Sequence, residues 1–441
     1  MFKNLVLAVS FGLLLFVSGC GDDVENTYTI VVQPEDKDTT RISALCPDSM
    51  GFYASSVIYG GLVADDQIYP AYVFLAPFLG DLYGGAAQKF FFNDDLFWME
   101  FCNPAKGSEV ILKMQATDIC DEKTMRLITG AEDTLRFVFP VAWNYDGLRK
   151  QTVTSPLLLR WEVTVDGKNI GEYSRLFKCY PIQQYVFRYH IPKDSEAYSV
   201  LKNENWESYP DFTWNDERCV VGFGPMLMGW VEEENPLMDQ LKREALDDGL
   251  MPEFGYVGGN ISDEATVAAL RSFWDLLRKR NYAYSWSTAL GDQYLRFPGE
   301  IVERRQGLCL ESSALFASLC LSCGLEGAFV VTPGHAYVVV KNVEGEWKFV
   351  LDAAIIGMGP SLAGFDQMEE IAQKEFELDR EKIASGELGY ALIPINDIRG
   401  VVPSINYWKG VQTKSAAPDT VKMIAPNDPR LWLRRVKSDI Q

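Results

Sequence analysis

Histidine, the side chain on which most acid–base chemistry near neutral pH depends, occurs only twice among 441 residues. His335 directly follows a Pro-Gly pair, which predicts a turn and places the imidazole at the entry to a strand. Asp352 follows the apolar run 347–351, which predicts a carboxylate at the end of a neighbouring strand. The other histidine, His190, falls inside a predicted strand, and we interpret it as structural.

Cys309 is the thiol whose surroundings predict reactivity. Gly307 allows a sharp entry turn, and the apolar residues after Cys309 predict a helix that ends at Gly324. The unpaired backbone N–H groups and the dipole at a helix start favour the thiolate over the thiol. If this helix start faces the strand that begins at His335, the imidazole reaches the sulfur, with the Asp352 carboxylate behind the ring.

These features, in this order, resemble the transglutaminase-like superfamily. They are Gly-x-Cys at 307–309, an apolar helix ending in glycine, Pro-Gly-His at 333–335, and Trp347 followed by Asp352. The segment 293–300 is similar to the residues before that cysteine in bacterial members. Over about residues 260 to 400, the resemblance implies a papain-like fold with a triad of Cys309, His335 and Asp352. Residues 311–313 replace the usual glutamine- or alanine-rich stretch, which leaves the substrate preference open.

The triad implies a cysteine peptidase, an amidase or an acyl transferase acting on a protein or peptide, with no cofactor. Cys309 would attack an amide carbonyl, His335 would pass a proton to the leaving amine, and Asp352 would fix the imidazole tautomer. The backbone N–H of Cys309 and the side chain of Gln293 are the candidate oxyanion donors. Water as the acceptor gives hydrolysis, and an amine gives cross-linking.

Other interpretations of these residues stay open. Cys309, Cys320, Cys323 and His335 are a possible zinc set, but the Cys-x-x-Cys pair falls late in the predicted helix rather than on a loop. We therefore expect no metal, and we expect Cys320 and Cys323 to be core residues. A catalytically inactive, lipid-anchored binding or assembly module with the same fold is the alternative function, because a fold does not fix an activity.

The N-terminus predicts a lipoprotein. The apolar run 5–17 is too short to span a bilayer and suits a secretory signal peptide, residues 1–19. It ends in Val-Ser-Gly-Cys20, which resembles a bacterial lipobox and implies cleavage before Cys20 and acylation of its thiol, with palmitate for example. The acidic tether after Cys20 resembles the export signal of bacterial surface lipoproteins. We therefore expect a cell-envelope location, at the outer membrane or cell surface rather than the inner membrane.

Composition and charge exclude several classes of protein. The chain is 47% apolar, which excludes a disordered chain. It carries 41 Lys and Arg against 61 Asp and Glu, and the net charge of −20 argues against nucleic acid as a partner. The nine cysteines give no unique disulfide pairing, and the oligomeric state stays open.

The pattern of the chain predicts an α+β protein of two domains. Alternation over 161–165 followed by Asp166-Gly167 predicts a hairpin, and further short strands predict an immunoglobulin-like sandwich. Helical periodicity follows, with helix starts expected at Asn235-Pro236 and Ser262. The predicted parts are a signal peptide 1–19, a tether 20–44, a β-sandwich domain 45–199, a transglutaminase-like domain 200–410 and a C-terminal extension 411–441.

Overall fold

The structure is a computed structural model, and it describes only part of the chain. The described residues are 51–54, 67–83, 97–102, 107–129, 134–185, 188–192, 212–214, 218–222, 224–250, 262–285, 293–357, 363–387 and 389–408. They all belong to one compact unit. The predicted signal peptide, the predicted lipidation site Cys20, the predicted tether and the predicted C-terminal extension lie outside the described residues.

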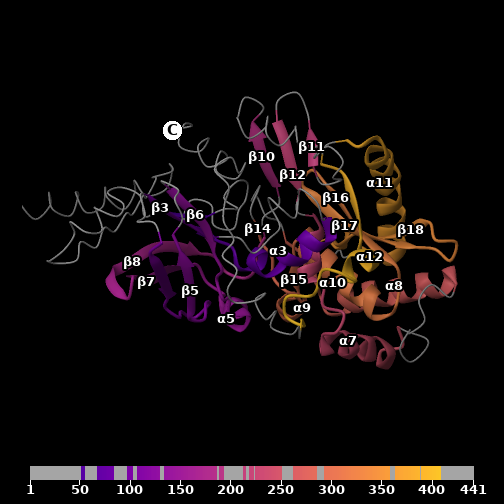
Figure 1. Ribbon diagram of the computed structural model, residues 1–441. Helices are drawn as coiled ribbons and strands as arrows, with labels where there is room; N and C mark the ends of the chain where they lie inside the picture. Colours follow the sequence, from indigo (N-terminus) through magenta and orange to yellow (C-terminus); the bar gives the residue numbers. More distant parts are fainter. Residues whose placement is uncertain are drawn as a thin grey trace, which may run out of the picture. The chain divides into compact units, whose positions relative to one another are not determined.

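The first part of the described chain is built mainly of strands (Figure 1). One five-stranded sheet has the order β2-β8-β7-β4-β5. Its strands are β2 (Gln67–Ile68), β4 (Glu109–Met114), β5 (Lys123–Ile128), β7 (Ser155–Val165) and β8 (Lys168–Cys179). Asp166 and Gly167, both with positive φ, close the hairpin between β7 and β8, so the predicted hairpin is confirmed.

Smaller sheets accompany it. A three-stranded sheet joins β1 (Gly51–Ala54), β3 (Phe97–Cys102) and β6 (Thr134–Phe139), and another joins β10 (Arg188–Pro192), β11 (Phe212–Trp214) and β12 (Arg218–Gly222). His190 lies in β10, opposite Val220. Two strands of two residues each, β9 (Gln184–Tyr185) and β14 (Gln293–Tyr294), pair with each other.

Two helices interrupt this strand-rich region, and the sequence pattern did not predict them. They are α3 (Pro70–Tyr83) and α5 (Tyr145–Lys150). Most residues of α3 are buried, so it has no polar face and no amphipathic period. Helices and strands are thus both present, and the predicted α+β class is confirmed at this level.

The predicted helices of the later part are confirmed together with their caps. The 3₁₀ helix η4 (Gly224–Trp230) precedes α7 (Pro236–Asp247), whose first turn is capped by the Asn235 side chain. Ser262 caps α8 (Asp263–Lys279) through a hydrogen bond from Ala265 N. Then come β13 (Ala283–Tyr284), α9 (Pro298–Arg304), β15 (Gln306–Gly307) and α10 (Cys309–Ser322).

A four-stranded antiparallel sheet in the order β18-β17-β16-β19 follows α10 in the sequence. Its strands are β16 (Gly327–Thr332), β17 (His335–Lys341), β18 (Trp347–Leu351) and β19 (Ala391–Pro394), with η5 (Ala353–Ile356), α11 (Phe365–Ser385) and α12 (Ile395–Arg399) between and after them. Every residue of β16 is buried, so both faces of the sheet are covered. Helix α10 packs against β16 and β17, and α11 packs against β18 (Figure 1).

Candidate active site

Cys309 is the first residue of α10. Leu308, with an extended backbone, is the N-cap residue, and the Cys309 N–H is one of the four that an α-helix leaves without a partner in the helix. The thiol is partly buried, whereas Cys120, Cys179, Cys320 and Cys323 are buried. The predicted helix start is therefore confirmed, and it combines a thiol that a reagent can reach with N–H groups that favour an anion.

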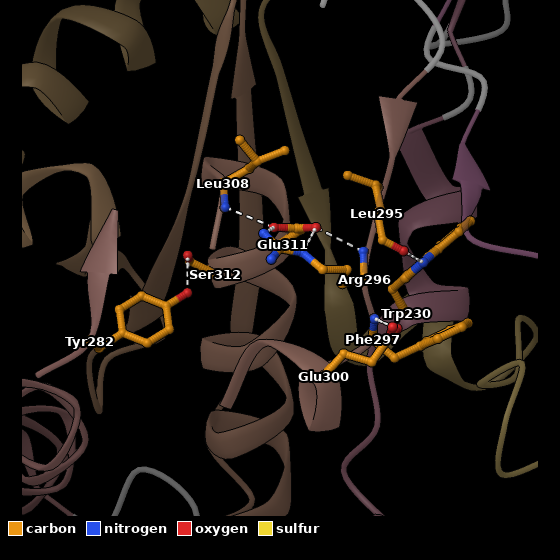
Figure 2. A network of polar contacts seen from close by, with 9 residues as sticks. All are labelled: Trp230, Tyr282, Leu295, Arg296, Phe297, Glu300, Leu308, Glu311 and Ser312. Atoms are coloured by element: carbon orange, nitrogen blue, oxygen red, sulfur yellow. Dashed lines mark hydrogen bonds and ion pairs between the residues drawn. The ribbon is translucent and has the colours of Figure 1, made fainter. Parts of the chain in front are cut away.

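Gly307 is required by the packing at this helix start. A Cβ at this position would lie 2.1 Å from the Tyr282 hydroxyl and 2.7 Å from Ser312 Oγ. These two oxygens are themselves 2.7 Å apart and form a buried hydrogen bond (Figure 2). The glycine of the Gly-x-Cys pattern thus makes room for a tyrosine that fastens α10 to the end of α8.

His335 stands at the start of β17. Thr332 and His335 are paired across the hairpin, and Gly334 between them has a φ of 91°, as the second central residue of a type II turn requires. The Nε2 nitrogen lies 2.9 Å from Asp352 Oδ2. Because an ionised carboxylate only accepts hydrogen bonds, Nε2–H is the donor, and Nδ1 is the nitrogen left for other contacts.

Asp352 is fixed through both of its oxygens. It follows β18 directly, and its Oδ1 accepts a hydrogen bond of 2.9 Å from Ala354 N at the start of η5. Its side chain is only 2% exposed. A buried carboxylate that is anchored in this way holds the imidazole in one orientation and one tautomer.

The electrostatics of His335 connect it to both predicted partners. Burial opposes the charged imidazolium, but the hydrogen bonds to Asp352 and Cys309 outweigh it and raise the pKa of His335 to about 10. The ring is therefore protonated at neutral pH. The structure brings Cys309, His335 and Asp352 together, in the order that the sequence predicted.

Tyr284 is a site residue that sequence reasoning missed. Its strand β13 pairs in parallel with β15, which sets Tyr284 opposite Gly307, and its N–H donates to Gly357 O at 3.3 Å. Burial raises the pKa of the Tyr284 hydroxyl above its ordinary value, and contacts with the Cys309 side chain add to the effect. The hydroxyl also contacts the backbone N–H of Cys309. It therefore stays a protonated donor beside the nucleophile.

Gln293, the predicted oxyanion partner, lies in β14 opposite Tyr185 of β9. Its role stays a prediction. The Tyr284 hydroxyl accepts a hydrogen bond from the Cys309 N–H and contacts the Cys309 side chain, so its position makes it a further candidate oxyanion donor.

A carboxylate and a guanidinium lie just behind the helix start (Figure 2). Glu311 Oε1 accepts hydrogen bonds of 2.8 Å from both the backbone N and the Nε of Arg296. Glu311 Oε2 accepts hydrogen bonds of 2.6 Å from the Arg296 guanidinium and 2.9 Å from Leu308 N. The Glu311 side chain is 1% exposed and that of Arg296 15% exposed, so this is a buried and fully hydrogen-bonded ion pair.

The four candidate zinc ligands that the sequence left open do not come together in the structure. Cys320 and Cys323 are buried, and Cys320 lies 11 residues after Cys309 on α10, which is about 16 Å along the helix. Burial raises the pKa of Cys323 to about 11. Over the described part of the chain, no group of three or more His, Cys, Asp or Glu residues is arranged to hold a metal ion. None of its helices is long and apolar enough to cross a membrane.

Comparison with known proteins does not name a family for this geometry: no family model and no curated protein matches the chain. The site itself therefore carries the functional argument. It consists of a thiol at a helix start, a protonated imidazole between that thiol and a buried carboxylate, and a tyrosine hydroxyl against the thiol.

Proposed function

We propose that this protein is a cell-envelope lipoprotein with a transglutaminase-like domain that acts as a cysteine-nucleophile amide or peptide hydrolase or acyl transferase. Its substrate is a protein or peptide. In this proposal, residues 200–410 form a papain-like domain and residues 45–199 an immunoglobulin-like sandwich. The helix that begins at Cys309, followed by the antiparallel sheet that carries His335 and precedes Asp352, supports the papain-like assignment.

The observation that carries the proposal is the position of the His335 imidazole. Its Nε2 is hydrogen-bonded to Asp352 at 2.9 Å, and the interaction of the ring with the Cys309 side chain helps to raise the pKa of the imidazole. A histidine with a purely structural role needs only one hydrogen-bond partner, and a cysteine with a purely structural role needs none. An imidazole shared between a carboxylate and a thiol at a helix start is the arrangement that activates a sulfur nucleophile.

The reaction follows from these contacts. The Cys309 thiolate attacks the amide carbonyl carbon, and the resulting oxyanion accepts hydrogen bonds from the Cys309 N–H and the Tyr284 hydroxyl. His335 then gives its proton to the leaving amine, the C–N bond breaks, and a thioester remains on Cys309. Neutral His335 next takes a proton from the acceptor, which attacks the thioester and restores the thiolate–imidazolium pair. A water acceptor yields a carboxylic acid, and a primary amine yields a new amide.

Labelling with a fluorescent iodoacetamide at pH 6 tests the proposal. At this pH an ordinary thiol, with a pKa of about 8.5, is almost entirely protonated and reacts slowly. We expect rapid labelling of the wild type, its loss in Cys309→Ser, and its retention in the matched control Cys320→Ser on the same helix. Equal labelling of the wild type and Cys309→Ser would contradict the proposal.

A turnover assay separates the active enzyme from the inactive alternative. Casein is incubated with a fluorescent primary amine, and both amine incorporation and peptide release are measured. Either product, absent in Cys309→Ser, supports catalysis and identifies the acceptor. Rapid labelling of Cys309 without either product would favour the lipid-anchored binding or assembly module.

A further inference from the structure

The carboxylate of Glu311 creates an electrostatic problem for the nucleophile. Glu311 lies two residues after Cys309, in the first turn of the same helix. There it accepts a hydrogen bond from the N–H of Leu308, the residue before Cys309, and so orders the helix start. An unpaired negative charge so close to the sulfur would, however, disfavour the thiolate. The Glu311 carboxylate is thus needed to hold the geometry of the helix start, and its negative charge has to be balanced by a nearby cation.

Arg296 supplies the missing charge and three hydrogen-bond donors. Its guanidinium binds both carboxylate oxygens of Glu311, and its backbone N–H binds one of them (Figure 2). The hydrogen bond to Glu311 raises the pKa of Arg296 above its ordinary value, so the guanidinium keeps its charge. The segment that carries Arg296 is itself fixed, because Leu295 O accepts a hydrogen bond of 2.8 Å from Trp230 Nε1.

We propose that Arg296 and Glu311 are positioning residues that form a charge-balanced clamp on the nucleophile. Glu311 holds the backbone at Cys309, and Arg296 cancels the charge that Glu311 would otherwise exert on the sulfur. The inference rests on the proposed role of Cys309 as the nucleophile. The inference gives a role to Glu311, which lies in the stretch 311–313 that replaces the usual glutamine- or alanine-rich residues after the cysteine.

Other titratable groups also act on this region and must be kept constant in a test. His335 of β17 and Tyr284 of β13 interact with the Cys309 side chain, and Asp352, after β18, holds the far side of the imidazole. Around the clamp lie Tyr282 from the segment between α8 and β13, Tyr294 from β14 and Glu300 from α9. The variants below leave all six of these groups unchanged.

The test measures the alkylation rate of Cys309 against pH, by mass spectrometry of the modified peptide, in the full-length protein. Glu311→Gln leaves Arg296 as an uncompensated cation, so the pH of half-maximal rate is expected to fall by about one unit. Arg296→Gln leaves the carboxylate uncompensated, so the midpoint is expected to rise by a similar amount, about one unit. The double variant has no net charge at the clamp and should return to the wild-type midpoint.

Two further sets of variants separate this effect from a loss of stability. Arg296→Lys keeps the charge but not the bidentate geometry, so it should lower stability and leave the midpoint near the wild-type value. Glu233 and Arg399 form a second ion pair at 2.8 Å, with similarly low exposures of 19% and 16%. The neighbouring Glu232 N–H binds Ser318, nine residues along α10 from Cys309, or about 14 Å. Replacing both Glu233 and Arg399 by Gln should not move the midpoint.

The outcomes distinguish the clamp from the proposed function. Opposite shifts in the two single variants, cancelled in the double variant, support the clamp. Shifts in the same direction, or no shift in Glu311→Gln, would overturn it and leave a purely structural ion pair. If wild-type Cys309 alkylates no faster than Cys320 at neutral pH, the proposed nucleophile itself fails, and this result is visible before any clamp variant is made.

Discussion

The ionised form of the His335 ring is stabilised by folding. Its pKa is about 10 in the folded protein, against an ordinary value of 6.5. Between these two values the folded state holds a proton that the unfolded state has lost. The stabilisation is therefore fully present below pH 6.5 and is lost as the pH rises toward 10.

We predict that Asp352→Asn flattens this dependence, because the amide hydrogen-bonds the imidazole but carries no charge. Urea unfolding, with Cys309→Ser in every variant so that the thiol releases no compensating proton, should show a loss of about 1.5 kcal/mol from this histidine between pH 6.5 and 8. The variant should lose less than half as much over the same range. His335→Gln, which has no imidazole at this position, gives the baseline. Parallel curves with and without Asp352→Asn would show that the carboxylate does not hold the proton on the ring.

The chemistry-bearing residues differ in how far the sequence reveals them. Cys309, His335 and Asp352 could be predicted because each one stands at the boundary of a long element with a clear apolar pattern. Tyr284 could not, because β13 has only two residues and its place beside Cys309 depends on a parallel pairing with a strand as short. The side-chain contacts of Arg296 likewise arise only in the folded chain.

At the scale of elements, Gly307 sets how closely α10 approaches α8 and β13. We predict that Gly307→Ala destabilises the protein by about 2 to 4 kcal/mol, because the added methyl group overlaps the buried Tyr282–Ser312 hydrogen bond. Urea unfolding measures the change. Gly299→Ala is the matched control, since nothing lies within 4 Å of a Cβ at that position in α9. Its effect should stay below about 1 kcal/mol.

A double-mutant cycle identifies the cause of that destabilisation. Tyr282→Phe removes the hydroxyl that a Cβ at Gly307 would meet at 2.1 Å. The combined variant Gly307→Ala with Tyr282→Phe should therefore be more stable than the sum of the two single changes implies. If the two changes in unfolding free energy simply add, the destabilisation does not come from the contact between the added methyl group and the Tyr282 hydroxyl.

The elements that the sequence predicted are the amphipathic and capped ones. Asn235 and Ser262 mark helix starts by side-chain hydrogen bonds that act locally, and Gly324, with a φ of 72°, follows the end of α10. Helix α3 escaped prediction because it is apolar on all sides and contains Pro77, so neither period nor cap distinguishes it from a buried strand. Its burial comes from tertiary packing, which no local pattern encodes.

At the scale of the whole molecule, the predicted boundary near residue 200 stays a prediction. Arg149 of α5 donates hydrogen bonds of 2.7 Å to Ile405 O and 2.9 Å to Trp408 O. The Trp408 ring also meets the Phe74 ring of α3 edge to edge, with centroids 5.2 Å apart. Residues from both sides of the predicted boundary are therefore fastened together, and the two parts support each other's stability.

The proposed lipid anchor also concerns the whole molecule. We predict that Cys20→Ala releases the protein from washed membranes of the expressing cells into the soluble fraction, because the acylated thiol is lost. Cys120→Ala, which changes a cysteine away from the N-terminus, should remain membrane-bound. Retention of the Cys20→Ala protein on the membranes would show that something other than this cysteine holds it there.

The pairing of Tyr284 has a consequence for when the protein becomes reactive. This residue is tied to Gly307 on one side and to Gly357 on the other, so the surroundings of the sulfur close only after 73 further residues of chain are in place. The entropy of closing such a long loop must be overcome before these contacts can form. Under the proposed function, the reactive site would therefore be assembled only when the fold is complete, after any export of the unfolded chain.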